Sequence, residues 1–259
     1  MNLPSSFQEY RELLDDRYRK YAHKLFVNND PIQIPHRFRK PQDIEISGIL
    51  AATIAWGNRK SIINSMDKLL HMLGNSPHEF VINFKPSDTK FFKGFVHRTL
   101  NEDDAIAFIT VLNNIYTEKG GLKKVFVDAF NRENDIKTAI NGFRKLFCQS
   151  HIPQRTLKHV PNVTAGSAAK RLNMFLRWMV RPNTEGIDFG IWNGIPTSAL
   201  LIPLDVHSAR VSRTLGLLNR AQNDMKAVEE LTAELKRFDP IDPVKYDFAL
   251  FGMGVYGDT

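Results

Sequence analysis

An aspartate at the start of a basic helix is the pattern in this sequence that points most directly to chemistry. Residues 201–217 run from a short apolar stretch, through Asp205, to an amphipathic segment that Gly216 closes. Aspartate is a favoured N-cap and glycine a favoured stop, so the pattern predicts a helix beginning directly after Asp205. The carboxylate either caps this helix only or also faces a reacting centre. His207 and Arg210 are predicted to face outward from the same helix.

A second basic segment carries a lysine near its start. Residues 166–181 combine an apolar stripe with basic residues beside it. If Ser167 is the N-cap, Lys170 falls in the first helical turn, where the positive helix end and the neighbouring Arg171 lower the pKa of its amine. The free amine is the form of lysine that attacks an electrophilic carbon. Lys170 is therefore either a Schiff-base nucleophile or an ordinary solvated lysine on a polar face.

The aspartate tract resembles one found in helix-hairpin-helix DNA glycosylases, with Pro-x-Asp-x-His at 203–207 followed by Arg and then Leu-Gly-Leu at 215–217. In that superfamily the aspartate is catalytic. The resemblance implies that Asp205 stabilises charge at the sugar C1′ and helps to deprotonate a nucleophilic lysine. It also implies an all-α, two-lobed architecture with the cleft between the lobes.

The position of the lysine narrows this resemblance. Most bifunctional members carry it on a short glycine-rich hairpin, but residues 182–190 contain no lysine and no such hairpin. The arrangement is instead similar to that of archaeal 8-oxoguanine DNA glycosylases, whose lysine opens the preceding helix. Here Lys170 precedes Asp205 by 205 − 170 = 35 residues. The resemblance implies that Lys170 is the Schiff-base nucleophile.

The whole chain also closely resembles an uncharacterised bacterial family of conserved hypothetical proteins. Four tracts carry this resemblance, at residues 34–38, 55–59, 170–181 and 239–254. The last tract is similar to the closing helix beside the active-site cleft of the glycosylases. Within it, Asp247 either caps or orients there or is an ordinary polar residue of an amphipathic helix.

The glycosylase resemblance implies contacts with an extruded nucleotide. The polar turn at 56–60 matches the place where glycosylases fill the gap in the duplex, which implies roles for Asn58 and Arg59; a plain helix stop is the alternative. Basic side chains expected to contact nucleic acid are Arg171, Arg177, Arg181, His207 and Arg210. The expected walls of the base pocket are Trp178, Phe189 and Trp192, for which packing in the core is the more usual role.

Composition sets the remaining limits. The chain has 259 residues, a net charge of +7 and one cysteine, Cys148. The positive charge favours an anionic partner, and nucleic acid is the default for such a protein. One cysteine excludes a disulfide framework and a four-cysteine iron–sulfur cluster, and we interpret it as a buried or incidental thiol. The histidines lack metal-ligand spacing, so no metal and no cofactor is expected.

Helical periodicity extends along the whole chain and predicts ten to twelve helices in a single domain, residues 1–259. The expected lobes are 42–150 and 165–259, with 1–41 as an N-terminal helical extension and a short extended piece near 200–202. The start of the chain lacks the pattern of a signal peptide and no long apolar run occurs, which predicts a cytoplasmic protein without a membrane partner.

Together these features predict a DNA-repair glycosylase that excises a damaged base from duplex DNA. A Schiff-base AP-lyase activity on an oxidised purine and a monomeric state are part of this prediction. The alternative is a catalytically inactive nucleic-acid-binding protein that retains the glycosylase scaffold, with duplex DNA or structured RNA as its partner.

Overall fold

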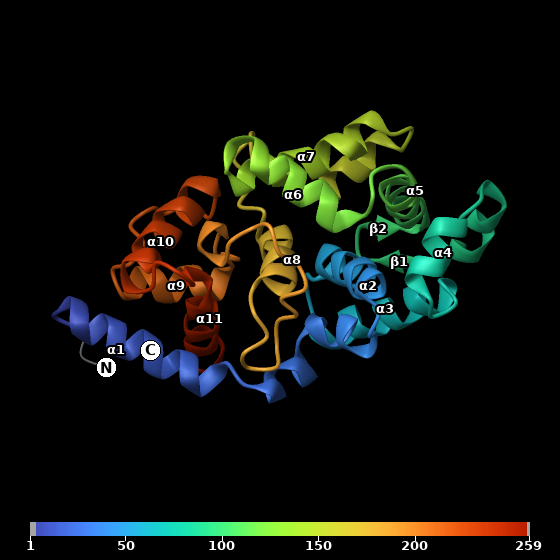
Figure 1. Cartoon of the computed structure of the whole chain (residues 1–259). Coiled ribbons are helices and arrows are strands. Elements are labelled where there is room, and N and C mark those ends of the chain that lie inside the picture. The colour runs from blue at the N-terminus through green and yellow to red at the C-terminus, as the bar shows by residue number, and fades with distance from the viewer. Residues whose placement is uncertain (1–3, 258–259) are drawn as a thin grey trace. The chain divides into compact units, whose positions relative to one another are not determined.

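The structure, a computed structural model, describes residues 4–257 and is mostly helical (Figure 1). This confirms the all-α prediction, and the eleven α-helices within these residues fall in the expected range. The predicted extension and second lobe reach into residues 1–3 and 258–259, which lie outside the described part. The chain forms two compact units: a first unit of residues 1–28 and 163–259, and a second unit of residues 29–162.

The second unit contains six α-helices and one short hairpin. Its α-helices are α2 (Pro41–Ile54), α3 (Arg59–Met72), α4 (Pro77–Asn83), α5 (Glu102–Glu118), α6 (Leu122–Glu133) and α7 (Ile136–Gln149). Short 3-10 helices lie at Pro31–Gln33, Pro35–Arg37, Pro86–Phe92 and Gln154–His159. Strands β1 (Val96–His97) and β2 (Leu100–Asn101) pair antiparallel, with Val96 opposite Asn101. The sequence did not predict this hairpin, because two-residue strands are too short to show an alternating pattern.

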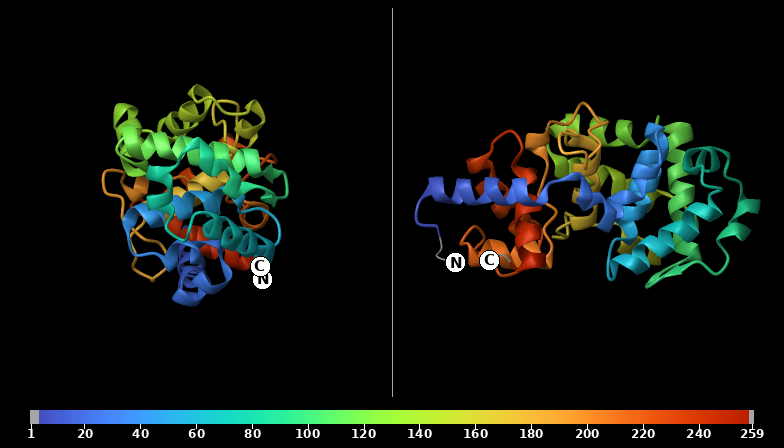
Figure 2. Two further views of the ribbon diagram at one scale, coloured as in Figure 1. Left: turned by 90° about the vertical axis from the view of Figure 1, so that its right-hand side faces the viewer. Right: turned by 90° about the horizontal axis from the view of Figure 1, so that it is seen from below.

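Local capping and aromatic packing hold these helices in place. Asn101 and Asp104 form a reciprocal capping box at the start of α5. Helices α6 and α7 pack side by side through the stacked rings of Phe126 and Phe143, whose centroids are 5.2 Å apart. Figure 2 shows this pair of helices from two further sides.

A buried carboxylate fastens the connector at residues 151–162 to α5. Asp104 is fully buried and accepts a hydrogen bond of 2.8 Å from the hydroxyl of Thr156. It also lies 3.3 Å from Nε2 of His159 and 3.1 Å from the guanidinium of Arg155. The ring of Trp56 stacks flat on His159. The connector is therefore ordered by polar contacts that its weak periodicity did not indicate.

The first unit combines the N-terminal helix with the C-terminal third of the chain. Its α-helices are α1 (Phe7–Tyr21), α8 (Lys170–Val180), α9 (Val206–Thr214), α10 (Met225–Phe238) and α11 (Tyr246–Tyr256). Short 3-10 helices lie at Lys24–Asn29, Thr197–Ala199 and Pro243–Lys245. Leu200, at the start of the predicted extended piece near 200–202, has an extended backbone with φ of −68° and ψ of 151°, and residues 200–202 form no strand. No helix within residues 4–257 is long and apolar enough to cross a membrane.

Helix α11 packs against both α1 and α9 (Figures 1 and 2). Two of its glycines permit this close approach. A Cβ atom at Gly252 would overlap the ring of Tyr21, and one at Gly254 would lie 2.8 Å from Cβ of His207. The absence of side chains at these two positions therefore brings the start of α9, which carries Asp205, against α11.

Candidate active site

Lys170 and Asp205 lie together at the N-terminal ends of α8 and α9. The Nζ atom of Lys170 is 3.6 Å from Oδ2 of Asp205. The other carboxylate oxygen, Oδ1, accepts hydrogen bonds from the backbone N–H groups of His207 at 2.8 Å and Ser208 at 2.9 Å. Asp205 is therefore the predicted N-cap and also the ion-pair partner of the lysine, and each role uses a different oxygen.

The carboxylate of this pair is held in place, whereas the amine is partly exposed to solvent. The side chain of Lys170 is 36% exposed and that of Asp205 is 11% exposed. A separation of 3.6 Å is longer than a hydrogen bond, and a partly exposed ion pair of this kind contributes little to stability. The N-cap bonds hold the carboxylate, whereas the lysine amine can move toward another partner. A fixed carboxylate beside a movable amine suits nucleophilic attack on a carbon that develops positive charge.

Helix α8 begins later than the sequence predicts. Its first residue is Lys170, and its N-cap position is Ala169, whose φ of 49° lies in the left-handed region. The predicted N-cap, Ser167, instead accepts a hydrogen bond from the backbone N–H of Ala169 at 3.3 Å. Serine side chains often close such local turns in competition with capping. The prediction of Ser167 as N-cap is therefore wrong, and Lys170 occupies the first helical position.

A second carboxyl group, that of Asp247 in the first turn of α11, is buried near this pair. Asp247 is 8% exposed, and its Oδ2 forms an ion pair with the guanidinium of Arg177 from α8. Burial raises the pKa of Asp247 to about 7; the positive charges of Arg177 and Lys170 oppose this rise, and the negative charge of Asp205 adds to it. The carboxyl group of Asp247 therefore exchanges its proton near neutral pH.

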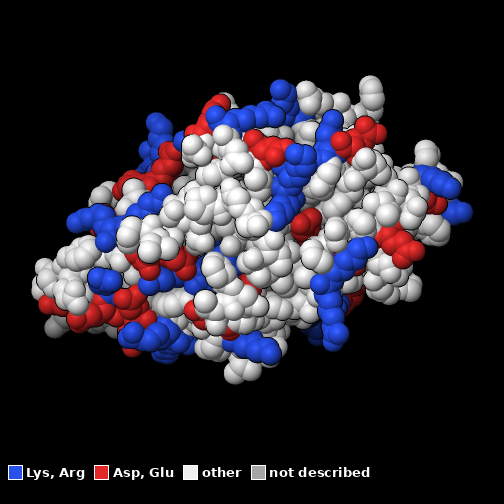
Figure 3. All heavy atoms as spheres, viewed as in Figure 1, with Lys and Arg blue, Asp and Glu red and all other residues white. Residues whose placement is uncertain are grey.

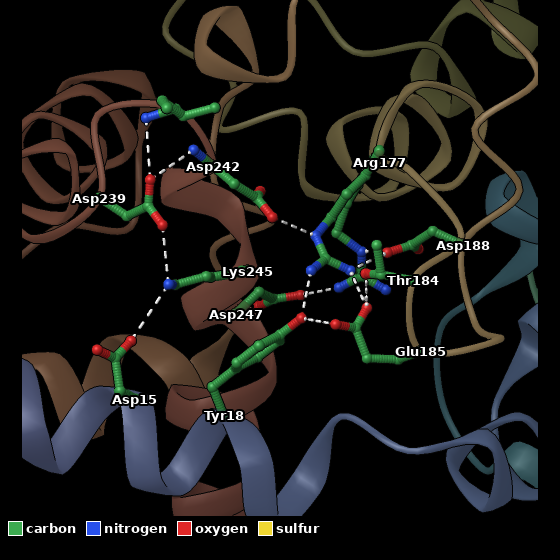
Figure 4. A network of polar contacts seen from close by, with 12 residues as sticks. Asp15, Tyr18, Arg177, Thr184, Glu185, Asp188, Asp239, Asp242, Lys245 and Asp247 are labelled. Atoms are coloured by element: carbon green, nitrogen blue, oxygen red, sulfur yellow. Dashed lines mark hydrogen bonds and ion pairs between the residues drawn. The ribbon is translucent and has the colours of Figure 1, made fainter.

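Two buried arginines, Arg177 of α8 and Arg181 at the C-cap of α8, form the centre of an acidic network (Figure 4). Arg177 and Arg181 are 3% and 2% exposed. Asp188 joins them, with one oxygen 3.2 Å from Nε of Arg177 and the other 3.0 Å from Nη1 of Arg181. Arg181 also pairs with Asp242 at 2.8 Å and donates to the hydroxyl of Tyr18 at 2.5 Å. Burial lowers the pKa of Arg181, but the pairs with Asp188 and Asp242 outweigh it and raise this pKa above its usual range.

The burial of these two arginines corrects their predicted role. Arg177 and Arg181 were expected to contact nucleic acid, because they lie outside the apolar stripe of α8. In the structure the segment after α8 turns back through Pro182, and Glu185 and Asp188 cover the guanidinium groups. A buried guanidinium bonded to carboxylates is not accessible to a phosphate group. The sequence signal for this arrangement, an acidic loop close behind two arginines, is weak.

The other basic candidates remain nearer the surface. His207 and Arg210 are exposed on α9, where Nη2 of Arg210 donates to the backbone oxygen of Gly254 at 2.8 Å. Arg171 is half-buried, and burial lowers its pKa to about 10. On the face shown in Figure 3, basic side chains are interspersed with acidic ones rather than gathered in one field. Among the basic residues predicted to contact nucleic acid in the first unit, those of α9 are thus exposed, whereas Arg177 and Arg181 are buried.

The predicted polar turn forms in the second unit. Helix α2 ends at Ile54 and α3 begins at Arg59, with Asn58 as its N-cap. The Asn58 side chain accepts a hydrogen bond from the backbone N–H of Ser61 at 3.3 Å. Asn58 is exposed and Arg59 is half-buried. The tight turn is confirmed, and the expected contact of these residues with an orphaned base stays a prediction.

The aromatic candidates for the base pocket differ in their burial. Trp178 and Trp192 are 0% and 2% exposed, and the ring of Trp192 packs edge-on against Phe175. Both tryptophans are therefore core residues, which corrects their assignment to an accessible base pocket. Phe189 is half-buried, and its backbone N–H donates to the oxygen of Trp178 at 2.8 Å. Cys148, interpreted as a buried or incidental thiol, is exposed.

The structure adds one residue that sequence reasoning did not single out and gives a place to another that it left between two roles. Asp188 links both arginines, and Asp247 lies near the lysine–aspartate pair. Lys170 and Arg177 are seven residues apart and therefore share one face of α8. This spacing is the one sequence signal that connects the Lys170–Asp205 pair with the network around the buried arginines. Among residues 4–257, no cluster of three or more histidine, cysteine or acidic side chains has an arrangement that could hold a metal ion.

Comparison with known protein families assigns the chain to one family, whose function is unknown. Residues 30–256 match a family described as "Protein of unknown function (DUF2400)", and the chain belongs to this family. The predicted membership in an uncharacterised family is confirmed. No curated protein and no solved structure matches the chain. The match begins after α1, although α1 is packed on α11 as part of the first unit.

Proposed function

We propose that this protein is a base-excision DNA glycosylase with Schiff-base AP-lyase activity, and that Lys170 and Asp205 are its reacting pair. The observation that carries the proposal is the 3.6 Å approach of the Lys170 amine to Oδ2 of Asp205, while Oδ1 is held in the N-cap of α9. The resemblance of residues 203–217 and 170–181 to glycosylase tracts supports it. A two-lobed helix-hairpin-helix architecture is part of the proposal, and the mostly helical structure is consistent with it.

The proposed chemistry assigns one task to each side chain. As the bond between C1′ and the damaged base breaks, the carboxylate of Asp205 stabilises the positive charge that develops on the sugar. The free amine of Lys170 forms a bond to C1′, and opening of the sugar ring gives a Schiff base. The Schiff base acidifies the hydrogens at C2′, so that loss of one of them expels the 3′ phosphate by β-elimination.

Duplex DNA carrying an oxidised purine is the proposed substrate class. The net charge of +7 supports an anionic partner. The residues proposed to contact DNA are the accessible ones: Asn58, Arg59, Arg171, His207 and Arg210. A target base must be extruded from the duplex for Lys170 to reach C1′. Phe189, which keeps partial exposure, is the remaining aromatic candidate for contact with that base.

The test is reductive trapping with borohydride on duplexes that contain 8-oxoguanine or an abasic site. We expect the wild type to form a covalent adduct at the abasic site and Lys170→Gln to form none, because glutamine has no nucleophilic amine. Asp205→Asn should slow base release about 100-fold or more, which is the usual effect of losing a charge-stabilising group. Lys226→Gln is the matched control, because Lys226 is an exposed lysine in the first turn of α10, behind the Asp224 N-cap.

Two results would contradict the proposal. An adduct that persists in Lys170→Gln would show that another amine reacts and would remove the role assigned to Lys170. The absence of both adduct and base release with the wild type, over a panel of oxidised purines, would remove the proposed activity.

A catalytically inactive nucleic-acid-binding protein is the second candidate, and specific observations favour it. Four of the predicted contact residues are buried, namely Arg177, Arg181, Trp178 and Trp192. Fewer groups therefore remain to bind DNA and enclose a base. This candidate requires binding to duplex DNA or structured RNA that weakens steeply with salt, without any chemical change in the nucleic acid.

A further inference from the structure

The carboxyl group of Asp247 faces the start of α9. Residues four and seven apart share one side of a helix, so Asp247, Phe251 and Gly254 lie on one side of α11. His207 contacts this side twice: its ring lies 6.1 Å from the ring of Phe251, and its Cβ lies against Gly254. His207 follows Asp205 by two residues. The same side of α11 therefore presents Asp247 to the end of α9 that carries Asp205.

Helix α8 approaches Asp247 from another direction. Lys170 and Arg177 are seven residues apart and share one face of α8. Arg177 forms its ion pair with Oδ2 of Asp247, and Lys170 forms its ion pair with Asp205. The two cations of this face are thus matched with two carboxyl groups, one on α11 and one on α9. Asp247 is held by an arginine that always stays charged and lies near the lysine proposed as the nucleophile.

The charged groups that act on Asp247 are Arg177 and Lys170 from α8, Asp205 from the N-cap of α9 and Asp188 from the loop after α8. The other elements packed on α11 bring three further titratable groups: His207 of α9 against Phe251, Tyr18 of α1 against Phe248, and Lys245 of the 3-10 helix Pro243–Lys245, which pairs with Asp15 and Asp239. Burial raises the pKa of Asp247 to about 7 against the pull of Arg177. A group with this pKa both accepts and returns a proton at neutral pH, which is the property that general acid–base chemistry requires.

We propose that Asp247 accepts the proton that Lys170 must lose before its amine attacks C1′ of an abasic site. Asp205 serves the preceding step, base release, in which its negative charge lies opposite the positive charge that develops at C1′. Asp247 has no such duty and is anchored by Arg177. This inference rests on the proposed function, and it divides between two carboxyl groups the work that the family resemblance assigns to Asp205.

The proton balance of the step is complete. The ammonium of Lys170, whose direct ion pair is with Asp205, gives one proton to the carboxylate of Asp247 through an intervening water molecule. The free amine then adds to the C1′ aldehyde of the ring-opened abasic site, forming the C–N bond as the C=O π bond breaks, and the amine proton moves to the former carbonyl oxygen. Asp247 returns its proton as this hydroxyl leaves as water and the C=N bond forms. The net change is an ammonium and an aldehyde converted to a protonated Schiff base and water.

The experiment is single-turnover trapping with cyanoborohydride on a duplex with a preformed abasic site, from mildly acid to mildly alkaline pH. The wild-type rate should rise with pH through an apparent pKa near the value of Asp247. Asp247→Asn should be about 100-fold slower at neutral pH and should lack this rise, since general acid–base groups typically contribute about 100-fold or more. Asp247→Glu, which keeps a carboxyl group, should restore part of the rate and the pH dependence.

Asp242→Asn is the matched control. Asp242 is also a carboxylate paired with a buried arginine of α8, at 2.8 Å from Arg181, and burial raises its pKa as well. It should keep the wild-type pH profile. If Asp247→Asn traps with the wild-type rate and profile, the role of Asp247 is overturned while the proposed function stands. If the wild type itself forms no adduct, the proposed function fails and this inference fails with it.

A second measurement does not depend on activity or on the folding of the Asp247 variants. The carboxyl ¹³C resonance of Asp247 is followed against pH in the wild type and in Lys170→Gln. Because the Lys170 charge lowers the pKa of Asp247, removing this charge should raise it. An unchanged titration midpoint would show that the two groups are not coupled and would overturn the proposal.

Discussion

Replacing Asp188 by asparagine should strongly destabilise the first unit. Asp188 is 1% exposed and contacts Arg177 and Arg181 with separate oxygens, at 3.2 Å and 3.0 Å. Breaking a buried ion pair on one side costs about 3–5 kcal/mol, because the remaining charge stays desolvated. Each arginine keeps another carboxylate, so we expect the lower end, about 3 kcal/mol. For a chain of this size that corresponds to a fall of about 6–12 °C in the unfolding midpoint.

Urea unfolding followed by tryptophan fluorescence measures this loss. In a Trp56→Phe background the two remaining tryptophans both lie in the first unit, so the signal reports that unit alone. Glu234→Gln is the matched control, since Glu234 pairs with Arg237 in an exposed position on α10 and its removal should cost less than about 1 kcal/mol. If the two variants lose the same stability, the network of Figure 4 does not act as a buried charge cluster.

Two further outcomes follow from local features. Burial raises the pKa of Asp247 to about 7 in the folded state, so the folded protein binds this proton more tightly than the unfolded chain does. Relative to Asp247→Asn, the wild type should therefore lose stability as the pH rises from about 4 to about 7. A difference between the two thermal midpoints that does not change with pH would contradict this. Gly57→Ala should cost about 1–3 kcal/mol, because φ of +93° lies outside the left-handed region open to alanine. Gly74→Ala, with φ of +62° and open space around the new methyl group, should cost less, and equal thermal midpoints would refute the backbone argument.

The features predicted correctly are those that depend on neighbours in the sequence. Asp205 is an N-cap because an aspartate directly before an amphipathic segment can reach the first free N–H groups of the helix. The turn at Gly57 is local in the same sense. The proximity of Lys170 to Asp205 is not local, and its prediction depended on resemblance to a family.

The features that sequence reasoning missed depend on distant partners. The outer face of α8 looked polar because Arg177 and Arg181 occupy it, yet residues 172–181 are buried on every side. Their partners Asp242 and Asp247 are 61 and 70 residues away along the chain. A helical pattern shows which residues share a face, but it does not show whether solvent or a second polar helix covers that face. Burial of a charged face is visible only once the partner helix is placed.

The network also changes how the net charge should be interpreted. Its members Arg177, Arg181, Glu185, Asp188, Asp242 and Asp247 contribute two positive and four negative formal charges, or −2. Since the whole chain carries +7, the rest of the chain carries +7 − (−2) = +9. The buried arginines therefore remove two predicted contacts without weakening the electrostatic case for an anionic partner. Because that attraction is independent of sequence and chemistry, it supports the enzyme and the inactive binder equally. The distinction between them therefore depends on whether the Lys170 amine reacts.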